Sequence, residues 1–453
     1  MAFTKFTIKN FKCFREEQVI IFGVPEEGVI GSGITYIVGA NNSGKTTIIE
    51  GLSIRNAHKL KNSERVEGLD PEFHLYEGET LRRKCSLVRP ESYTIVESPQ
   101  LGDEEKFEII SSRRHWDSQA NSNFSSLGQS LGNAYRFNGR QNNIEVASEL
   151  RIIEADTQKY DEFISLVKRV IPEFTKFAVG YEDNEYIEYI SGNGARHKTD
   201  LLGDGVITVI RILLQLYISK PGALIIDEPE LSLHPAAQKK LLEVIAEYSE
   251  KRQIIISTHS PYFIQWNFLK NGAVVNRVVK QEDRESLIYS ISDFSQYETI
   301  ISGQNWQQPY LLDEVAKEIF FSEDHILFLE GQEDVGLLRE ESRLNGVNVF
   351  GYGVRGKDNF KIAFKLAQDL GYKKVCCIID GGTDENAVKA DLESSFSETG
   401  YKVVQWEKAD IRDKSVYSTT EKEGYFTNRG IKKSPDQLAD FETKLTEIIQ
   451  YLS

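Results

Sequence analysis

The sequence predicts an α/β protein made of two successive domains. Short apolar strands alternate with amphipathic helices over about residues 1–300 and again over 324–453, with a linker at 301–323. This alternation is typical of mainly parallel sheets covered by helices. The chain has 453 residues, of which 40% are hydrophobic. That content is enough for two cores and excludes a largely disordered protein.

The first block opens with apolar segments at 3–11, 16–22 and 33–39, which predict three strands, and a helix is expected from about Gly44. Residues 59–150 are less regular, so they predict an irregular insertion. Within it, the stretch 111–143 is rich in Ser, Asn, Gly and Gln, which is typical of a loop. Two interpretations of this stretch stay open: a solvated excursion, or a surface that binds a partner or nucleic acid.

Regular patterning returns at about residue 161. Apolar residues at helical spacing predict a helix over 161–174, and two short apolar runs predict a strand pair across Asp183-Asn184. The rest of this block predicts a helix from Asp204, a strand at 223–227, a helix after His234, a strand at 253–258 and strands near 273–291. In the second block, four strands are expected, with helices between them and a closing helix after Ser434; they are ILFLE, VNVFGY, KVCCIID and YKVVQW.

The charge and cysteine content exclude several classes of protein. A formal charge of −15 excludes a coat held on nucleic acid by bulk charge, so contact with DNA requires a local basic surface or a bridging metal ion. No apolar run reaches the about 18 residues of a membrane span, and no signal peptide is apparent. The four cysteines form no CxxC pair, which argues against a disulfide scaffold and a zinc ribbon. We therefore expect a cytoplasmic protein with no membrane partner.

The most specific motif is GANNSGKTT, which follows an apolar strand and precedes a helix. It matches G-x4-G-K-[ST], a loop whose backbone N–H groups face phosphate oxygens at a helix N-terminus. Lys45 is expected to reach the β- and γ-phosphates of ATP, and Thr46 to hold Mg²⁺. The predicted nucleotide-binding residues of this loop are Gly39, Asn41, Asn42, Ser43, Gly44, Lys45, Thr46 and Thr47.

Three further segments complete the predicted nucleotide site. The strand ALIID places Asp227 to hold Mg²⁺ and Glu228 to polarise the attacking water. The helix start Gly203-Asp204-Gly205 predicts a second phosphate-binding nest. His259 directly follows a strand and is expected near the γ-phosphate. A simple P-loop kinase is disfavoured, because the glycine helix start and His259 would then have no role.

This ordered set resembles the ATPase heads of the ABC, SMC and RecF-like class. GANNSGKTT resembles their Walker A motif, LLGDGV the signature motif, LIIDEPELSLHP the Walker B motif and D-loop, and STHSPYF the switch-histidine segment. The resemblance implies that two heads sandwich ATP, so ATP is expected to promote a homodimer or higher oligomer through the heads. The signature departs from the serine-containing transporter form, which leaves its contact with the γ-phosphate open.

A second group of acids follows the strands of the C-terminal block. Glu330 and Asp380 each end an apolar strand, and Asp334 is expected on the first turn of the next helix. Because parallel strands deliver such residues to one edge of a sheet, these acids are expected to converge. Oxygen ligands without His or Cys favour Mg²⁺ or Mn²⁺, and two such ions can cleave a phosphodiester. The alternative is that strand-end acids are solvated or cap helices.

This block resembles a Toprim domain, with LEGQEDV as its glutamate motif and VCCIIDGG at its DxD motif. An ABC-type head followed by a Toprim domain is the arrangement of the OLD family (overcoming lysogenization defect). These are ATP-regulated nucleases often found in anti-phage defence. The resemblance implies DNA as a partner and a companion from the same defence system, such as a reverse transcriptase with its nucleic acid or a helicase.

The resemblance also implies roles for individual residues. Glu330, Asp334 and Asp380 would be metal ligands, with Asp384 as the candidate to replace the second aspartate of DxD, where this chain has Gly382. A catalytic lysine is expected after the fourth strand. Lys408 and Lys414 are the candidates, and Lys414 is preferred.

A lysine-rich helix offers a local positive surface. Lys357, Lys361 and Lys365 recur along it, and the two interpretations are a DNA-binding surface and a solvated helix face.

Two functions from different classes follow. The first is an ATP-gated, metal-dependent DNA endonuclease. The second is a regulatory ATPase whose degenerate Toprim domain binds a partner or nucleic acid without cutting, as Gly382 indicates. A primase or topoisomerase is disfavoured, because no zinc ribbon or catalytic-tyrosine domain is evident.

Overall fold

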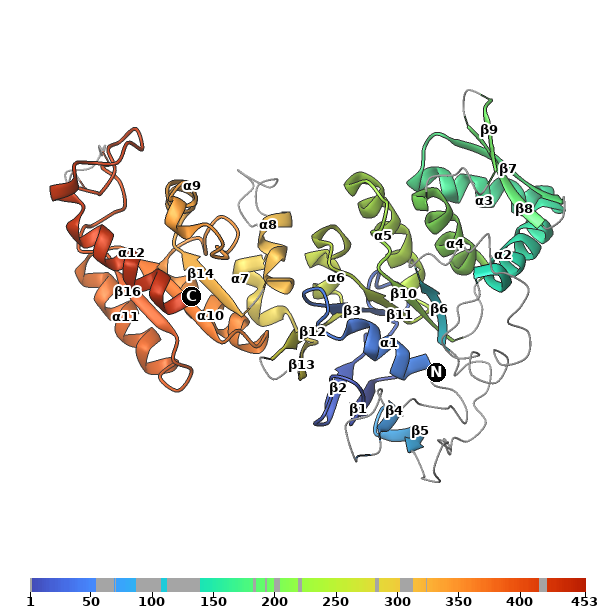
Figure 1. The fold of residues 1–453 in the computed structure, drawn as a ribbon, viewed down its shortest axis with the longest axis horizontal. Helices are drawn as coiled ribbons and strands as arrows, with labels where there is room; N and C mark the ends of the chain where they lie inside the picture. Colours follow the sequence, from blue (N-terminus) through green and yellow to red (C-terminus); the bar gives the residue numbers. More distant parts are fainter. Residues whose placement is uncertain are drawn as a thin grey trace, which may run out of the picture. The chain divides into compact units, whose positions relative to one another are not determined.

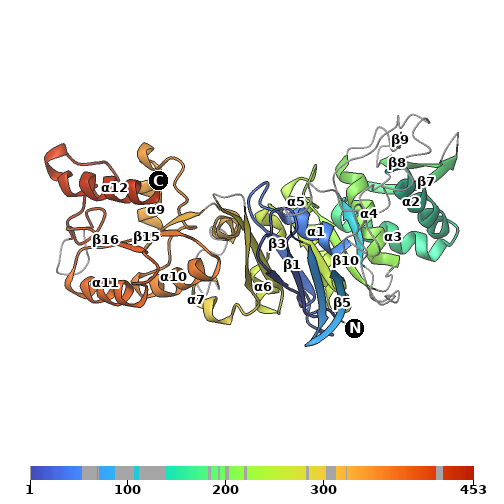
Figure 2. The same ribbon diagram turned by 60° about the horizontal axis from the view of Figure 1, so that its bottom comes forward.

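The structure is a computed structural model, and it describes residues 2–53, 69, 71–86, 107–111, 139–181, 185–191, 194–198, 204–218, 222–281, 285–301, 313–322, 324–414 and 422–453 (Figures 1 and 2). The chain divides into two compact units, Met1–Ser292 and Asp293–Ser453. The segment expected to be a linker, 301–323, therefore belongs to the second unit. Its residues Ile319 and Phe320 are at most 1% exposed, and Phe294 and Tyr297, which precede the segment, are also buried.

A six-stranded sheet forms the centre of the first unit, in the order β13-β12-β3-β11-β10-β6. Five strands are parallel: β12 (Val274–Lys280), β3 (Ile34–Val38), β11 (Ile254–Ser257), β10 (Ala223–Asp227) and β6 (Phe107–Ser111). The edge strand β13 (Ser286–Ile291) is antiparallel to β12. All residues of β3, β10 and β11 are buried, as expected for near-continuous apolar strands in the middle of a parallel sheet.

A second, antiparallel sheet packs beside the first in the order β2-β1-β4-β5. It comprises β2 (Gln18–Ile21), β1 (Lys5–Lys9), β4 (Glu72–Glu77) and β5 (Thr80–Ser86). Its apolar side chains share one core with those of the central sheet and of α1 (Lys45–Ser53); this core includes Phe6, Ile8, Ile48, Leu52, Phe73, Leu75 and Ile225.

The expectation of an irregular insertion over 59–150 was wrong for the described part of that segment. It supplies β4, β5, β6 and the start of α2 (Gly139–Glu154). Phe73 and Leu75 alternate with charged or polar residues, so a half-buried strand is hidden in a polar sequence. Of the predicted loop 111–143, residues 112–138 lie outside the described residues, and 139–143 belong to α2.

Helices and a small sheet complete the first unit. The predicted helix and strand pair are confirmed as α3 (Thr157–Val170), β7 (Phe174–Tyr181) and β8 (Glu185–Ser191), to which β9 (Arg196–Lys198) adds a third strand. Asp156 caps α3 by accepting hydrogen bonds from the N–H groups of Gln158 and Lys159. The helices α4 (Asp204–Ile218) and α5 (Pro235–Ser249) lie where the sequence predicts them, and α6 (Trp266–Lys270) follows β11.

The second unit has a parallel three-stranded sheet in the order β14-β15-β16, formed by β14 (His325–Leu329), β15 (Lys374–Ile379) and β16 (Lys402–Gln405). Figure 2 shows α9 (Gln332–Arg339) and α12 (Ala439–Leu452) on one face, with α10 (Phe360–Asp369) and α11 (Thr383–Ser395) on the other. Two short helices, α7 (Glu298–Ile301) and α8 (Asp313–Lys317), precede the sheet.

The second of the four predicted strands, over 347–352, does not form as a strand. The segment makes only isolated bridges, between Leu327 and Val349 and between Gly351 and Gly353. Both glycines have positive φ, 46° and 92°, so the chain turns there instead of continuing in extended form. Among the helices that the structure describes, none is long and apolar enough to cross a membrane.

Candidate functional site

The phosphate loop connects β3 to α1 and is tightly packed. Gly39 and Gly44 have φ values of 142° and 113°, which favour glycine. A Cβ on Gly39 would lie 2.3 Å from the carbonyl oxygen of Val278, and one on Gly44 would lie 2.8 Å from Sγ of Cys13. The curvature of the loop therefore depends on two positions that have no room for a side chain.

The Lys45 side chain lies over its own loop. Its Nζ donates hydrogen bonds of 2.9 Å to the carbonyl oxygens of Gly39 and Ala40, and the residue is only 5% exposed. Thr46 and Thr47 lie in the first turn of α1, where backbone N–H groups lack helical partners. Asn41 and Asn42 are exposed at the tip of the loop, and Ser43 is buried beneath it. A charged phosphate oxygen is a stronger acceptor for Lys45 than these neutral carbonyls.

Three predicted segments lie together at the carboxyl ends of the parallel strands of the central sheet. The strands β3, β11 and β10 are adjacent and parallel, and the register pairs Asp227 with Ser257 and Ser257 with Ile37. The phosphate loop, the Asp227-Glu228 pair and His259 follow these strands directly. The structure thus brings together residues that lie far apart in the sequence.

Glu228 adopts a backbone conformation that is uncommon for a residue other than glycine. Its φ is 52°, and its N–H donates to the carbonyl oxygen of Ser257 at 2.8 Å. Non-glycine residues in this region cost about 1–2 kcal/mol, and such strain is common at functional sites. The Nε2 atom of His259 lies 3.7 Å from Oε1 of Glu228.

A residue that the sequence did not single out, Glu230, holds the histidine turn. The backbone N–H of His259 donates to Oε1 of Glu230 at 2.8 Å, and Nε2 of the ring lies 3.6 Å from the same oxygen. Glu230 is 8% exposed, and burial raises the pKa of its carboxyl. The contact spans 29 residues of sequence, so no local pattern could indicate it.

The turn after His259 is also connected to the D-loop. Oγ of Ser260 donates to Oε1 of Gln238 at 2.6 Å, and Nε2 of Gln238 donates to the carbonyl oxygen of Leu233 at 2.8 Å. Ser260 and Gln238 are buried. Two hydrogen bonds therefore join the segment after β11 to the segment after β10.

The predicted signature segment is only partly described. Gly203 lies outside the described residues, and Asp204 begins α4. A Cβ on Gly205 would lie 2.3 Å from the carbonyl oxygen of Ser232, so glycine allows α4 to approach the D-loop closely. This contact explains Gly205 by packing, and a phosphate-binding role for 203–205 stays a prediction.

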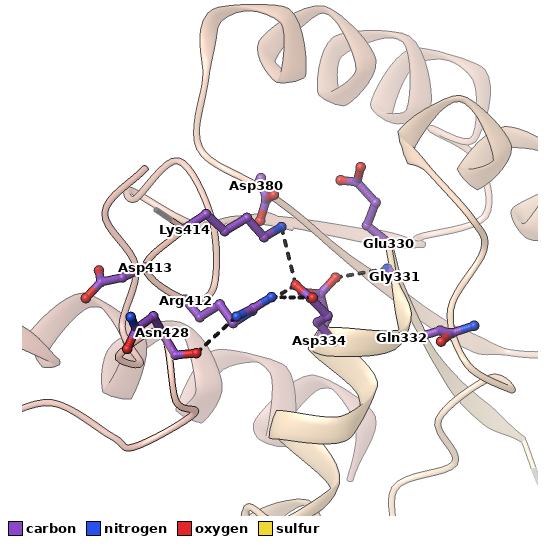
Figure 3. Close-up of a pocket in the computed structure, with 10 residues that line it drawn as sticks. Glu330, Gly331, Gln332, Asp334, Asp380, Arg412, Asp413, Lys414 and Asn428 are labelled. Atoms are coloured by element: carbon purple, nitrogen blue, oxygen red, sulfur yellow. Dashed lines mark hydrogen bonds and ion pairs between the residues drawn. The ribbon is translucent and has the colours of Figure 1, made fainter. Parts of the chain in front are cut away.

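In the second unit, a cavity of about 720 Å³ opens where β14 and β15 end (Figure 3). Its lining residues are Glu330, Gly331, Gln332, Glu333, Asp334, Asp380, Arg412, Asp413, Lys414 and Asn428. Figure 3 shows Glu330 and Asp334 on the segment that joins β14 to α9 and Asp380 on another segment, with Arg412 and Lys414 entering from the other side. We call this cavity the acidic pocket.

Burial and mutual repulsion perturb the carboxyl groups of the acidic pocket. Burial first, and then neighbouring carboxylates, raise the pKa of Asp380 to about 8 and that of Asp334 to about 6. The pKa of Glu330 is also raised, by burial and then by Glu385. Oδ2 of Asp334 accepts a hydrogen bond of 2.9 Å from the N–H of Gly331, which fixes it at the start of α9.

Asp410 is a further acid that the sequence did not single out. It is 1% exposed, and its charge raises the pKa of both Asp334 and Asp380. Its Oδ2 lies 2.6 Å from Nζ of Lys414 and 3.8 Å from Nζ of Lys422. The signal available in the sequence was its spacing of four residues from Lys414 in the segment ADIRDK.

Carboxylate oxygens are the ligands that Mg²⁺ and Mn²⁺ prefer, so the donor set fits such a cation in kind. Within the described ranges, however, no group of three or more His, Cys, Asp or Glu side chains is arranged so that it could hold a metal ion. A cation would have to draw the acids together. Asp384 does not join them: it is exposed on the first turn of α11, outside the lining of the acidic pocket.

The two candidate lysines lie in different places. Lys414 lines the acidic pocket. Lys408 instead donates to Oε1 of Glu423 at 2.8 Å and to the carbonyl oxygen of Gly424 at 3.2 Å.

Of the two interpretations of the lysine-rich segment, a DNA-binding surface and a solvated helix face, the ion pairs of its lysines and of Lys373 favour the second. The ion pairs are Lys357–Glu385, Lys361–Asp391, Lys365–Asp369 and Lys373–Asp324.

Two protein families match parts of the chain. Residues 1–111 match a family described as "AAA ATPase domain", and residues 100–265 match one described as "AAA domain, putative AbiEii toxin, Type IV TA system". Neither match extends past residue 265.

Two curated proteins match short segments. The chain is 38% identical over 79 residues to an OLD nuclease from Thermus scotoductus, a match that covers 15% of each chain. It is 35% identical over 81 residues to the phosphate import ATP-binding protein PstB from Malacoplasma penetrans, covering 16% of this chain and 28% of that protein. The chain thus matches less than a third of the length of either relative.

Among solved structures, the SMC head domain from Thermotoga maritima aligns with 64% of this chain and 99% of its own, at 17% identity and a TM-score of 0.40. The Smc head domain from Pyrococcus furiosus aligns similarly, at 14% identity and the same TM-score. The family matches together span residues 1–265, and this part of the chain is an AAA/ABC-like ATPase domain with a P-loop.

Proposed function

We propose that this protein is an ATP-regulated nuclease that cleaves DNA in the acidic pocket of its second unit with the help of divalent cations. The observation that carries the proposal is the convergence of Glu330, Asp334 and Asp380 on one pocket beside Lys414. Short-segment similarity to an OLD nuclease supports the same activity.

Each side chain of the pocket has a proposed task. Glu330, Asp334 and Asp380 would hold Mg²⁺ or Mn²⁺, which when bound supplies an activated water and stabilises the leaving oxygen. Lys414 would offset negative charge on the phosphodiester, while Asp410 fixes the position of its ammonium group. Asp384 has no task in this scheme.

The ATPase domain is proposed to regulate cleavage. Lys45, Thr46 and the 203–205 segment would bind ATP, Asp227 would hold its Mg²⁺, and Glu228 would polarise water. Pairing of two ATP-bound domains would then control access of DNA to the acidic pocket. The match to a family described as an AAA domain of toxin–antitoxin systems is consistent with a defence role.

The direct test is cleavage of circular DNA with Mg²⁺ or Mn²⁺. We expect Glu330→Gln to lower the rate at least about 100-fold, since even outer-shell changes at metal sites often cost about 10- to 100-fold. The matched control is Asp391→Asn, because Asp391 is an exposed acid of the same unit that pairs with Lys361. Equal nicking by wild type and Glu330→Gln would refute the assignment.

A second candidate is a regulatory ATPase whose second unit binds a partner or nucleic acid without cutting. Gly382 in place of an acid, and the absence of a ready ligand group among the described residues, favour it. Titration calorimetry with Mn²⁺ separates the two functions. Binding that is lost in Asp380→Asn supports the nuclease, whereas a wild-type protein that neither binds Mn²⁺ nor nicks DNA supports the second candidate.

A further inference from the structure

Glu333, in the first turn of α9, lies between two cations of the acidic pocket. Nε of Arg412 donates to its Oε2 at 2.9 Å, and Nη2 of Arg412 pairs with its Oε1. Nζ of Lys414 lies 3.5 Å from the same carboxylate. The Glu333 carboxylate is thus bound by two nitrogen atoms of a guanidinium and lies beside an ammonium group. Proteins bind phosphate groups with the same arrangement of donors.

Other groups of the protein also bind the two cationic side chains, Arg412 and Lys414. Nη1 of Arg412 donates to the carbonyl oxygen of Asn428 at 3.2 Å, and Lys414 is fixed by the buried Asp410. The Glu333 side chain, by contrast, is 47% exposed. Glu333 is therefore the replaceable partner, whereas Arg412 and Lys414 keep their positions without it.

The distribution of charge in the pocket points to the same place. Among the described residues that line it, Arg412 and Lys414 are the two cationic ones, and they lie across from the three acids. A polyanion that enters the pocket is repelled by the acids and attracted by these two side chains. A phosphate that binds both of them competes with Glu333, which already pairs with each.

We propose that Arg412 and Lys414 form a binding site for one phosphate group of a nucleic-acid backbone, and that Glu333 occupies this site until a phosphate displaces it. The inference rests on the proposed function in one respect: it assigns nucleic acid to the same pocket. It adds a binding residue, Arg412, and an internal competitor, Glu333.

The test is binding of a short labelled oligonucleotide, single-stranded or duplex, to the full chain in EDTA at several salt concentrations. We expect Arg412→Ala to weaken binding about tenfold and to lower the slope of log K against log salt by about 1. Glu333→Gln should strengthen binding about fivefold by removing the competitor. In the double variant this gain should disappear.

The matched control is Asp413→Asn, which removes the same charge from the same pocket. Asp413 pairs with Lys433, whose Nζ lies 2.7 Å from Oδ1 of Asp413, and not with Arg412. We expect Asp413→Asn to strengthen oligonucleotide binding by less than half of the gain seen for Glu333→Gln. Equal gains would show that bulk charge alone acts, and would overturn the proposal. Arg412→Lys keeps the positive charge but loses the bidentate guanidinium, so it should bind the oligonucleotide with intermediate affinity. Thermal unfolding of each variant checks that it is folded.

Cleavage assays on the same variants separate this inference from the proposed function. Metal-dependent cleavage combined with equal binding by all variants overturns the phosphate site and leaves the nuclease intact. Binding that depends on Arg412, without cleavage, supports the phosphate site and removes the nuclease. A wild-type chain that neither binds nor cleaves overturns both.

Discussion

At the scale of single residues, the predicted nucleotide site includes a buried carboxylate to which the sequence assigned no role, although it lies within LIIDEPELSLHP. Glu230 accepts the backbone N–H of His259 and lies beside its ring. Glu230 does not belong to the phosphate loop or to the acid pair that follows β10. We infer that it is a positioning residue that sets the orientation of His259.

We expect Glu230→Ala to lower the ATPase rate about tenfold, because the His259 turn loses an acceptor worth about 1–3 kcal/mol. Glu230→Gln keeps an amide oxygen as acceptor and should retain most of the rate. ATPase assays over pH 6–9 provide the readout, since a reoriented imidazole also shifts the pH profile. Equal losses in the two variants would contradict positioning through the hydrogen bond.

The exposed acid Glu243 on α5 offers a control for this series. Glu243→Ala removes a carboxylate from the same part of the first unit without touching the histidine turn. Its ATPase rate and pH profile should match those of wild type.

At the scale of elements, the acidic pocket exists because two neighbouring parallel strands end in acids. The strands β14 and β15 are in register from His325 to Leu329, so Glu330 and Asp380 emerge at the same edge. The start of α9 adds Asp334. Without a bound cation, the closeness of these carboxyl groups disfavours their ionisation. The free energy of unfolding of the protein therefore depends on pH.

The sign of this dependence follows from Asp380. Its pKa is about 8 in the folded chain against 3.8 as its ordinary value, so its neutral form is favoured by folding. The stability that it contributes is complete below about pH 4 and is lost as the pH rises through 8. We expect the metal-free protein to lose about 4 kcal/mol of unfolding free energy between pH 5 and pH 8.5 through this group.

Urea unfolding in EDTA at the two pH values measures the effect. Asp380→Asn should flatten the difference, whereas Asp436→Asn, in an exposed position, should preserve it. Mg²⁺ should stabilise the wild type most at the higher pH, because ligands must be deprotonated. An unchanged pH dependence in Asp380→Asn would rule out this origin.

How far the site could be predicted from sequence depends on the range of the contacts. The phosphate loop, Asp227 and the strand-end acids could be predicted, because a strand and its following turn fix where such residues lie. Asp410, Glu230 and the Glu333–Arg412 pair could not, since each depends on segments joined only by the fold. The strands β4 and β5 were missed because polar residues dominate their sequences.

At the scale of the whole molecule, our proposal places two phosphate chemistries on one chain. The ATPase domain spans residues 1–265, and the acidic pocket belongs to the unit Asp293–Ser453. A link between them requires that ATP changes the state of the molecule, and pairing of ATPase domains is the change that we propose.

We expect Glu228→Gln to slow ATP hydrolysis at least about 100-fold, because a general base contributes about 10²- to 10⁴-fold. The ATP-bound dimer should then accumulate, as measured by light scattering after size exclusion with and without ATP. Lys45→Ala should stay monomeric under both conditions. Normal turnover by Glu228→Gln would exclude Glu228 as the base, and an ATP-independent size in both variants would contradict pairing.

The polar contacts of Ser260, Gln238 and Leu233 have a mechanical consequence. Because Ser260 and Gln238 are buried, neither can break its bond without stranding a polar group in the interior. The backbone after His259 and the backbone before α5 are therefore expected to move together. We expect a displacement of His259 to move the neighbouring D-loop as well.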